Sequence, residues 1–115
     1  MNFLTGTPTV PQIRVYRNRN AATKARLPLL LDVQTDLLED LGTRVVTPMA
    51  PAAGLVKRSA MQKLTPFCVV DGREYVLVTP QLAGIATKEP GPAISDLSTE
   101  RASIIAALDL LLTGI

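Results

Sequence analysis

Short runs of β-branched and aliphatic residues, separated by turn-forming residues, dominate the first half of the chain. Residues 12–17, 29–34 and 43–49 are three such runs, and each predicts a β-strand. The polar residues 18–25 between the first two runs predict a hairpin loop. Pro48 predicts that the third strand ends or bulges there, because proline has no N–H to give to the ladder.

The strongest β signal lies in residues 67–78. The apolar run 67–70 is followed by Asp71-Gly72 and then by the second β-rich run 75–78. Asp-Gly between two such runs predicts a type I′ turn, since glycine accepts a positive φ and aspartate tolerates one. We therefore expect an antiparallel hairpin here.

Three segments carry weaker signals. Residues 1–11, with two prolines and a glycine, predict an extended or mobile arm ahead of the domain. Residues 51–63 are compatible with a short helical turn or with an irregular connection. Residues 80–91 predict a loop that contains at most one short strand before the last helix.

The end of the chain predicts a helix that starts at Ser98 and is ended by Gly114. As the N-cap, the Ser98 hydroxyl is expected to accept a hydrogen bond from a first-turn N–H, and Glu100 lies where the helix dipole favours a negative charge. The apolar positions extend well beyond one stripe: Ile104, Ile105, Ala106, Ala107, Leu108, Leu110, Leu111, Leu112 and Ile115. Such a helix needs a second surface besides its own domain, or a membrane.

Length and composition favour one soluble domain. The 115 residues allow a modest core, and the 3% aromatic content makes that core aliphatic. The single cysteine, Cys68, excludes an internal disulfide, suits a reducing compartment and is expected to be a small buried apolar group. The C-terminal apolar run is only about a dozen residues long, whereas a membrane span needs about 20, and residues 1–10 lack a signal-peptide pattern. We expect a cytoplasmic protein that does not enter a membrane.

The residues present offer little catalytic chemistry. The absence of histidine removes His-based triads and His-containing metal sites, and one cysteine cannot form a Cys-rich zinc site. The acidic group that could bind a cation or act as an acid/base pair is Asp32, Asp36, Glu39 and Asp40, for which turn formation and solvation are the favoured roles. We expect a binding protein without a metal or cofactor.

Basic residues gather in the first quarter of the chain. The formal charge is only +2, but Arg14, Arg17, Arg19, Lys24 and Arg26 precede every acidic residue. This distribution suits an anionic partner or a plain solvated surface. Base-stacking platforms are scarce among so few aromatic residues, so direct nucleic-acid binding by the chain alone is not expected.

Four short motifs, in their order and spacing, resemble the CcdB family of toxins from toxin–antitoxin pairs. They are Asp32–Asp36 (DVQTD), Arg44–Pro48 (RVVTP), Asp96–Ser98 (DLS) and the closing Gly114-Ile115. The resemblance covers residues 12–115, which we take as the toxin domain. It implies a mainly β fold with a C-terminal helix, an SH3-like barrel of the CcdB/MazF/Kid type, and a homodimer with the helices near its two-fold axis.

The resemblance also implies partners and contact residues. A family dimer binds the A subunit of DNA gyrase and traps the cleaved DNA complex, and a CcdA-like antitoxin neutralises it through a disordered acidic segment. Arg14, Arg17 and Arg19 are the expected antitoxin contacts. The expected dimer contacts are Leu111, Gly114 and Ile115, and the gyrase-contacting positions correspond to Leu37, Leu38, Asp109, Leu112, Thr113, Gly114 and Ile115.

Two of these positions depart from the family pattern. Thr113 stands where the family has a tryptophan, and Asp109 stands where it has an asparagine. A tryptophan anchor can contribute about 2 kcal/mol or more at an interface, and threonine cannot replace its stacking. Two alternatives therefore stay open: a dimeric binding protein that recognises the antitoxin but has weakened or redirected gyrase activity, and an endoribonuclease of the MazF/Kid type.

Overall fold

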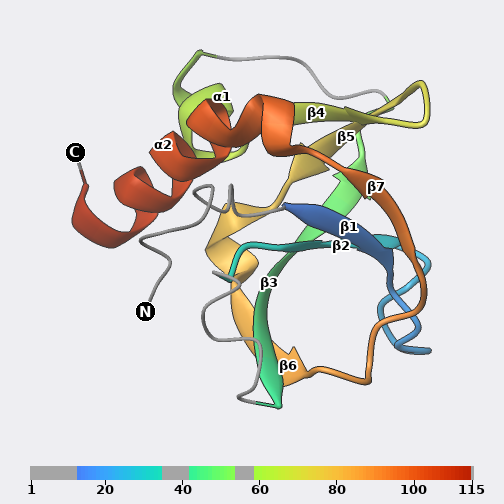
Figure 1. The fold of residues 1–115 in the computed structure, drawn as a ribbon. Helices are drawn as coiled ribbons and strands as arrows, with labels where there is room; N and C mark the ends of the chain where they lie inside the picture. The colour runs from blue at the N-terminus through green and yellow to red at the C-terminus, as the bar shows by residue number, and fades with distance from the viewer. Residues whose placement is uncertain (1–12, 35–41, 54–58, 115) are drawn as a thin grey trace, which may run out of the picture.

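The computed structural model describes residues 13–34, 42–53 and 59–114, and within them the chain forms one curved antiparallel sheet with a C-terminal helix (Figure 1). The strands are β1 (Arg14–Arg17), β2 (Leu29–Asp32), β3 (Thr43–Pro51), β4 (Phe67–Val70), β5 (Arg73–Leu77), β6 (Ala83–Ala86) and β7 (Ala93–Asp96). The helices are α1 (Ser59–Leu64) and α2 (Arg101–Thr113), with single 3₁₀ turns at Thr79–Gln81 and Ser98–Glu100. The predicted mainly β fold with a C-terminal helix is confirmed. The predicted arm, residues 1–11, lies outside the described residues.

The sheet follows the order β4-β5-β3-β2-β1-β7, and β6 pairs with the first part of β3. β3 is long enough to pair with β6 through Thr43–Val46 and with β5 through Met49–Pro51, while β2 lies along its other side. This shared strand lets the sheet curl into the half-barrel seen in Figure 1. The predicted strands at 12–17, 29–34 and 43–49 correspond to β1, β2 and β3.

The predicted strand end at Pro48 is wrong. Pro48 lies inside β3, opposite Leu30 of β2, and the strand continues to Pro51. The Pro48 carbonyl still accepts a hydrogen bond from the Val78 N–H (2.9 Å). The missing proline N–H is tolerated because β3 changes partner from β6 to β5 at this residue, so the ladder on that side is already interrupted.

The hairpin of β4 and β5 is confirmed together with its turn. Asp71 has φ 50° and Gly72 has φ 78°, and the pair Val70 and Arg73 closes the turn. Two consecutive positive φ values are those of a type I′ turn, whose twist matches that of the flanking strands. The ambiguous segment 51–63 contains the short helix α1 in its second half.

The segment before the last helix is more regular than predicted. β6 accounts for the one short strand expected within residues 80–91, but β7 is an additional strand. β7 pairs with β1, with Asp96 opposite Arg14 and Ala93 opposite Tyr16. An alanine-containing segment after a Pro-Gly-Pro run has little strand propensity of its own, so this strand depends on the edge that β1 provides.

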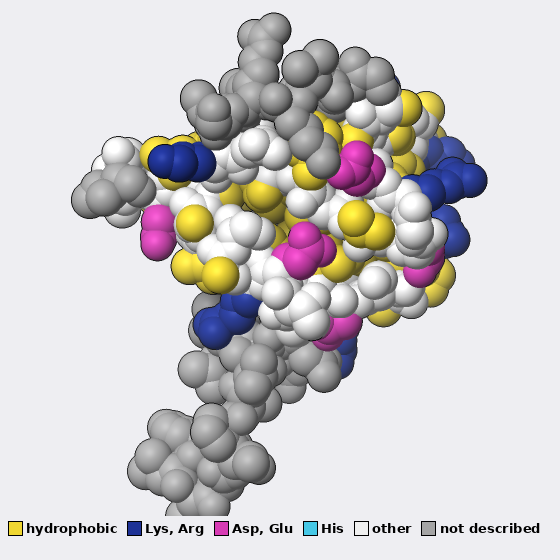
Figure 2. Space-filling view, turned by 90° about the horizontal axis from the view of Figure 1, so that it is seen from above, with side chains coloured by type: hydrophobic (Ala, Val, Ile, Leu, Met, Phe, Trp, Pro, Cys, Tyr) yellow, Lys and Arg dark blue, Asp and Glu magenta, His cyan; other side chains and the backbone are white. Residues whose placement is uncertain are grey.

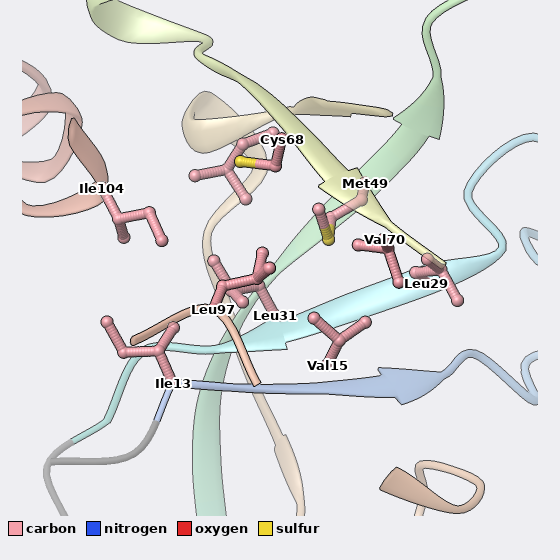
Figure 3. Close-up of a cluster of buried hydrophobic side chains, with 10 residues drawn as sticks. Ile13, Val15, Leu29, Leu31, Met49, Cys68, Val70, Leu97 and Ile104 are labelled. Carbon is pink, nitrogen blue, oxygen red and sulfur yellow. The ribbon is translucent and has the colours of Figure 1, made fainter. Parts of the chain in front are cut away.

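The main core lies between one face of the sheet and the inner side of α2 (Figure 3). Ile104 of α2 is fully buried, and its side chain points toward the other side chains of the core. The core is aliphatic, as predicted: Ile13, Val15, Leu29, Leu31, Met49, Cys68, Val70, Leu77, Leu97 and Ile104. Cys68 is buried, in agreement with its predicted role. Neither helix of the described residues is long and apolar enough to cross a membrane.

The predicted N-cap at Ser98 is wrong in its detail. α2 begins at Arg101 after a 3₁₀ turn, and no side chain caps it. The Asp96 carboxylate instead accepts hydrogen bonds from the Ser98 N–H (2.7 Å) and from the Ser98 hydroxyl. These bonds hold the pKa of Asp96 below its ordinary value, with the Ser98 hydroxyl as the main cause. The first-turn N–H groups of Glu100 and Arg101 donate instead to the Leu97 and Ser98 carbonyls of the 3₁₀ turn, which leaves no donor there for the Ser98 hydroxyl.

Candidate functional site

The last turn of α2 forms an exposed tip at one end of the molecule (Figure 1). Gly114 ends the helix in the left-handed conformation, with φ 75°, and its N–H donates to the Leu110 carbonyl (3.0 Å), as the sequence predicts. The Thr113 hydroxyl donates to the Asp109 carbonyl (2.6 Å). At the tip, the Thr113 side chain is therefore bonded to its own helix, and the backbone conformation is the left-handed one that Gly114 allows.

Four of the predicted gyrase-contacting residues meet at this tip. Asp109, Leu112, Thr113 and Gly114 are all exposed, and the Leu112 side chain is 70% exposed. Leu111, a predicted dimer contact, is half-buried beside them. The predicted contacts Leu37, Leu38 and Ile115 lie outside the described residues.

α2 carries an unusually apolar exposed face. Only Ile104 and Ala107 of this helix are buried, whereas Ile105 is 41% exposed and Ala102 and Ala106 are also exposed. Figure 2, which views the molecule from the α2 side, shows apolar side chains spread between acidic ones on this face. Large apolar side chains exposed on one helix indicate a partner surface, as the sequence pattern suggested.

The predicted antitoxin contacts are surface residues. Arg14 and Arg17 belong to β1 and Arg19 to the loop that follows, and all three are exposed. Arg19 also has a structural role, because it donates to the carbonyls of Lys88 (2.8 Å) and Glu89 (3.1 Å).

Asp32 is not the solvated turn residue that we predict from the acidic cluster. Its side chain is 5% exposed and accepts a hydrogen bond from Arg44, whose side chain is 11% exposed, at 2.7 Å. The other Asp32 oxygen accepts from the Gln34 N–H (3.0 Å), and the Gln34 amide bonds to Val45 N–H and to the Thr43 carbonyl. This network ties the end of β2 to the start of β3.

No group of three or more potential metal ligands occurs among the described residues. The other acidic residues of that cluster, Asp36, Glu39 and Asp40, lie outside them. Cys68 is a poor nucleophile, because burial, aided by the nearby negative charge of Glu100, raises the pKa of its thiol to about 12. Cys68 is therefore a buried apolar group, as the sequence predicts, and not a reactive thiol.

Sequence reasoning misses two features of the structure. The first is the buried ion pair of Asp32 and Arg44. The two residues belong to the motifs DVQTD and RVVTP, but only the pairing of β2 with β3 shows that they meet. The second is a pocket between the β1–β2 loop and β6, lined by residues from four separate segments. No local sequence pattern marks such a pocket, because its walls meet only in the folded chain.

A comparison with known protein families agrees with this architecture. The model of the family described as CcdB protein matches residues 12–114 of the 115-residue chain. The match includes every described strand and helix, the buried ion pair and the exposed α2 tip. The chain therefore belongs to the CcdB family.

Proposed function

We propose that the protein is the toxin of a type II toxin–antitoxin system, acting in the cytoplasm as a homodimer of SH3-like barrels. The dimer binds the A subunit of DNA gyrase and traps the complex in which gyrase holds cleaved DNA. The observation that carries this proposal is the family match over residues 12–114. Members of the family poison gyrase and are not enzymes in their own right, so catalytic residues are not required.

The exposed helix supports both expected interactions of α2. Its apolar face offers area for a second copy of the chain, and the adjoining tip offers Asp109, Leu112, Thr113 and Gly114 to gyrase. A dimer contact and a target contact can adjoin on one short helix, because the half-buried Leu111 and the exposed Leu112 lie on different sides of it. Leu37, Leu38 and Ile115 complete the proposed gyrase surface.

The second candidate is a dimeric binding protein that recognises its antitoxin but has weakened or redirected gyrase activity. Thr113 favours it, because this residue provides no aromatic surface and its hydroxyl is already bonded to the helix backbone. In both candidates the basic residues Arg14, Arg17 and Arg19 complement an acidic antitoxin segment, which would fold on binding.

Co-purification with the gyrase A subunit separates the two candidates. The wild-type chain is expected to bind the subunit measurably, and Thr113→Trp is expected to bind about tenfold or more tightly, because an aromatic anchor at an interface centre contributes about 2 kcal/mol. Thr87→Trp is the matched control, since it makes the same change at an exposed threonine of the β6–β7 connection, outside α2. Absence of binding by wild type, with binding restored in Thr113→Trp alone, would favour the second candidate. Absence of binding by all three folded proteins would refute gyrase recognition.

A further inference from the structure

A pocket of about 360 Å³ opens on the face of the sheet that does not contact the core. Leu30 lies between Leu29 and Leu31 in β2, and since side chains alternate along a strand, it points away from the core that those two residues join. Leu30 is nevertheless buried, because the β1–β2 loop and β6 cover this second face. The pocket floor is entirely aliphatic: Leu27, Leu30, Val46, Pro48, Ala83 and Ile85.

The wall of the pocket is built from two loops that are fixed to each other. The Asn18 amide donates to the Thr23 hydroxyl (3.0 Å) and to the Leu27 carbonyl (2.8 Å), which closes the β1–β2 loop on itself. Arg19 bonds to the carbonyls at positions 88 and 89 of the β6–β7 connection, and the Gly91 N–H donates to the Arg17 carbonyl (2.8 Å). A wall held by bonds between loops is preorganised, which lowers the entropy lost when a ligand binds.

Two opposite charges line the same pocket. Arg19 uses two of its five N–H donors on the carbonyls, which leaves three for a ligand. The Glu89 backbone carbonyl accepts the hydrogen bond from Arg19, while the Glu89 carboxylate forms no ion pair or hydrogen bond with the described residues. The pocket lining thus includes one cationic and one anionic residue, both exposed to solvent, together with the aliphatic floor.

We propose that this pocket binds a small aliphatic zwitterion, of the chemical class of a free aliphatic amino acid. The ligand carboxylate pairs with Arg19, its ammonium group pairs with Glu89, and its branched side chain fills the space above Leu30 and Ile85. No aromatic residue of the described chain lines the pocket, so among these residues stacking on a nucleobase or an aromatic ligand has no counterpart. The volume lies at the small end of the range for ligand pockets, about 300–1,000 Å³.

The test is a titration of the full ¹⁵N-labelled chain with L-leucine, followed by NMR of the backbone amides. Saturable shifts are expected for residues 18–27 and 81–89. Leucinamide, which lacks the carboxylate, and 4-methylpentanoate, which lacks the ammonium group, are each expected to bind at least about tenfold more weakly, because each loses one charge-assisted contact. The absence of saturable shifts with leucine, or equal affinity for the three compounds, would overturn the proposal.

Two variants assign the site. Ala83→Phe fills the pocket from an exposed position of β6 and is expected to abolish the leucine shifts, whereas Ala53→Phe, at an exposed position outside the pocket lining, is expected to preserve them. Glu89→Gln is expected to weaken leucine binding by about tenfold while leaving 4-methylpentanoate unaffected. Undiminished leucine binding in folded Ala83→Phe or in Glu89→Gln would contradict this assignment.

Discussion

Breaking the buried pair of Arg44 and Asp32 is expected to be among the most costly single changes in the described chain. In Arg44→Met the Asp32 carboxylate, whose side chain is 5% exposed in the wild type, loses the guanidinium that it meets at 2.7 Å. Removing one partner of a buried pair typically costs about 3–5 kcal/mol, because the other charge is left buried without compensation. Since small domains have unfolding free energies of about 5–15 kcal/mol, this is a large part of the total.

Urea denaturation measures the effect directly. With an m value of about 1–3 kcal/mol/M, a loss of 3–5 kcal/mol moves the midpoint down by about 2 M. The control is Arg26→Met, which removes an exposed arginine and is expected to change stability by less than about 0.5 kcal/mol. Equal midpoints for the two variants would refute the importance of the pair.

The double variant Asp32→Leu with Arg44→Met separates charge from packing. It buries no charge, so most of the lost free energy is expected to return, except about 1 kcal/mol for the bond from the Gln34 N–H to Asp32. A double variant as unstable as the sum of the two single variants would show that the residues do not interact.

Three further predictions concern packing and ionisation. Thr47→Val is expected to stabilise the fold by about 1 kcal/mol in urea denaturation, because the buried Thr47 hydroxyl has no hydrogen-bond partner among the described residues; a loss of stability would contradict this. Gly91→Ala is expected to destabilise the fold by about 1 kcal/mol, because the new Cβ would lie 3.2 Å from the Arg17 Cβ. Gly84→Ala is the neutral control, because a Cβ at that position would have no atom within 4 Å. Equal changes in stability for the two variants would refute the close approach at Gly91. Because the pKa of the Cys68 thiol is raised from 9.0 to about 12 in the folded chain, its contribution to folding stability is complete below pH 9 and is lost as the pH rises toward 12. The free energy of unfolding of wild type relative to Cys68→Ala is therefore expected to fall over that pH range. A difference that stays constant with pH would contradict this.

Local sequence signals predicted the elements whose geometry is decided locally. Asp71-Gly72 determines its own turn, and Gly114 ends its helix, because few other residues adopt a positive φ at low cost. β7 escaped prediction because its strand conformation comes from pairing with β1, about 80 residues earlier in the chain. The Ser98 cap was predicted wrongly because the first-turn N–H groups donate to the Leu97 and Ser98 carbonyls, while Ser98 itself donates to Asp96.

The candidate site divides in a similar way. The apolar excess of α2 is readable from sequence, and the structure leaves Ile105 and Leu112 exposed as that excess implies. The burial of Asp32 is not readable, because its partner Arg44 is twelve positions away and the two meet only through the register of β2 and β3. The pocket beneath the β1–β2 loop likewise requires the three-dimensional fold.

The central proposal, that this CcdB family member poisons gyrase, is tested most directly by a cleavage assay with purified components. The protein is incubated with gyrase, ATP and supercoiled plasmid, and the complexes are then denatured and treated with protease. We expect linear DNA to accumulate with increasing protein and to disappear when Leu112→Glu places a charge on the exposed helix tip. Supercoiled and relaxed plasmid alone, at concentrations where the folded protein binds the gyrase A subunit, would contradict it.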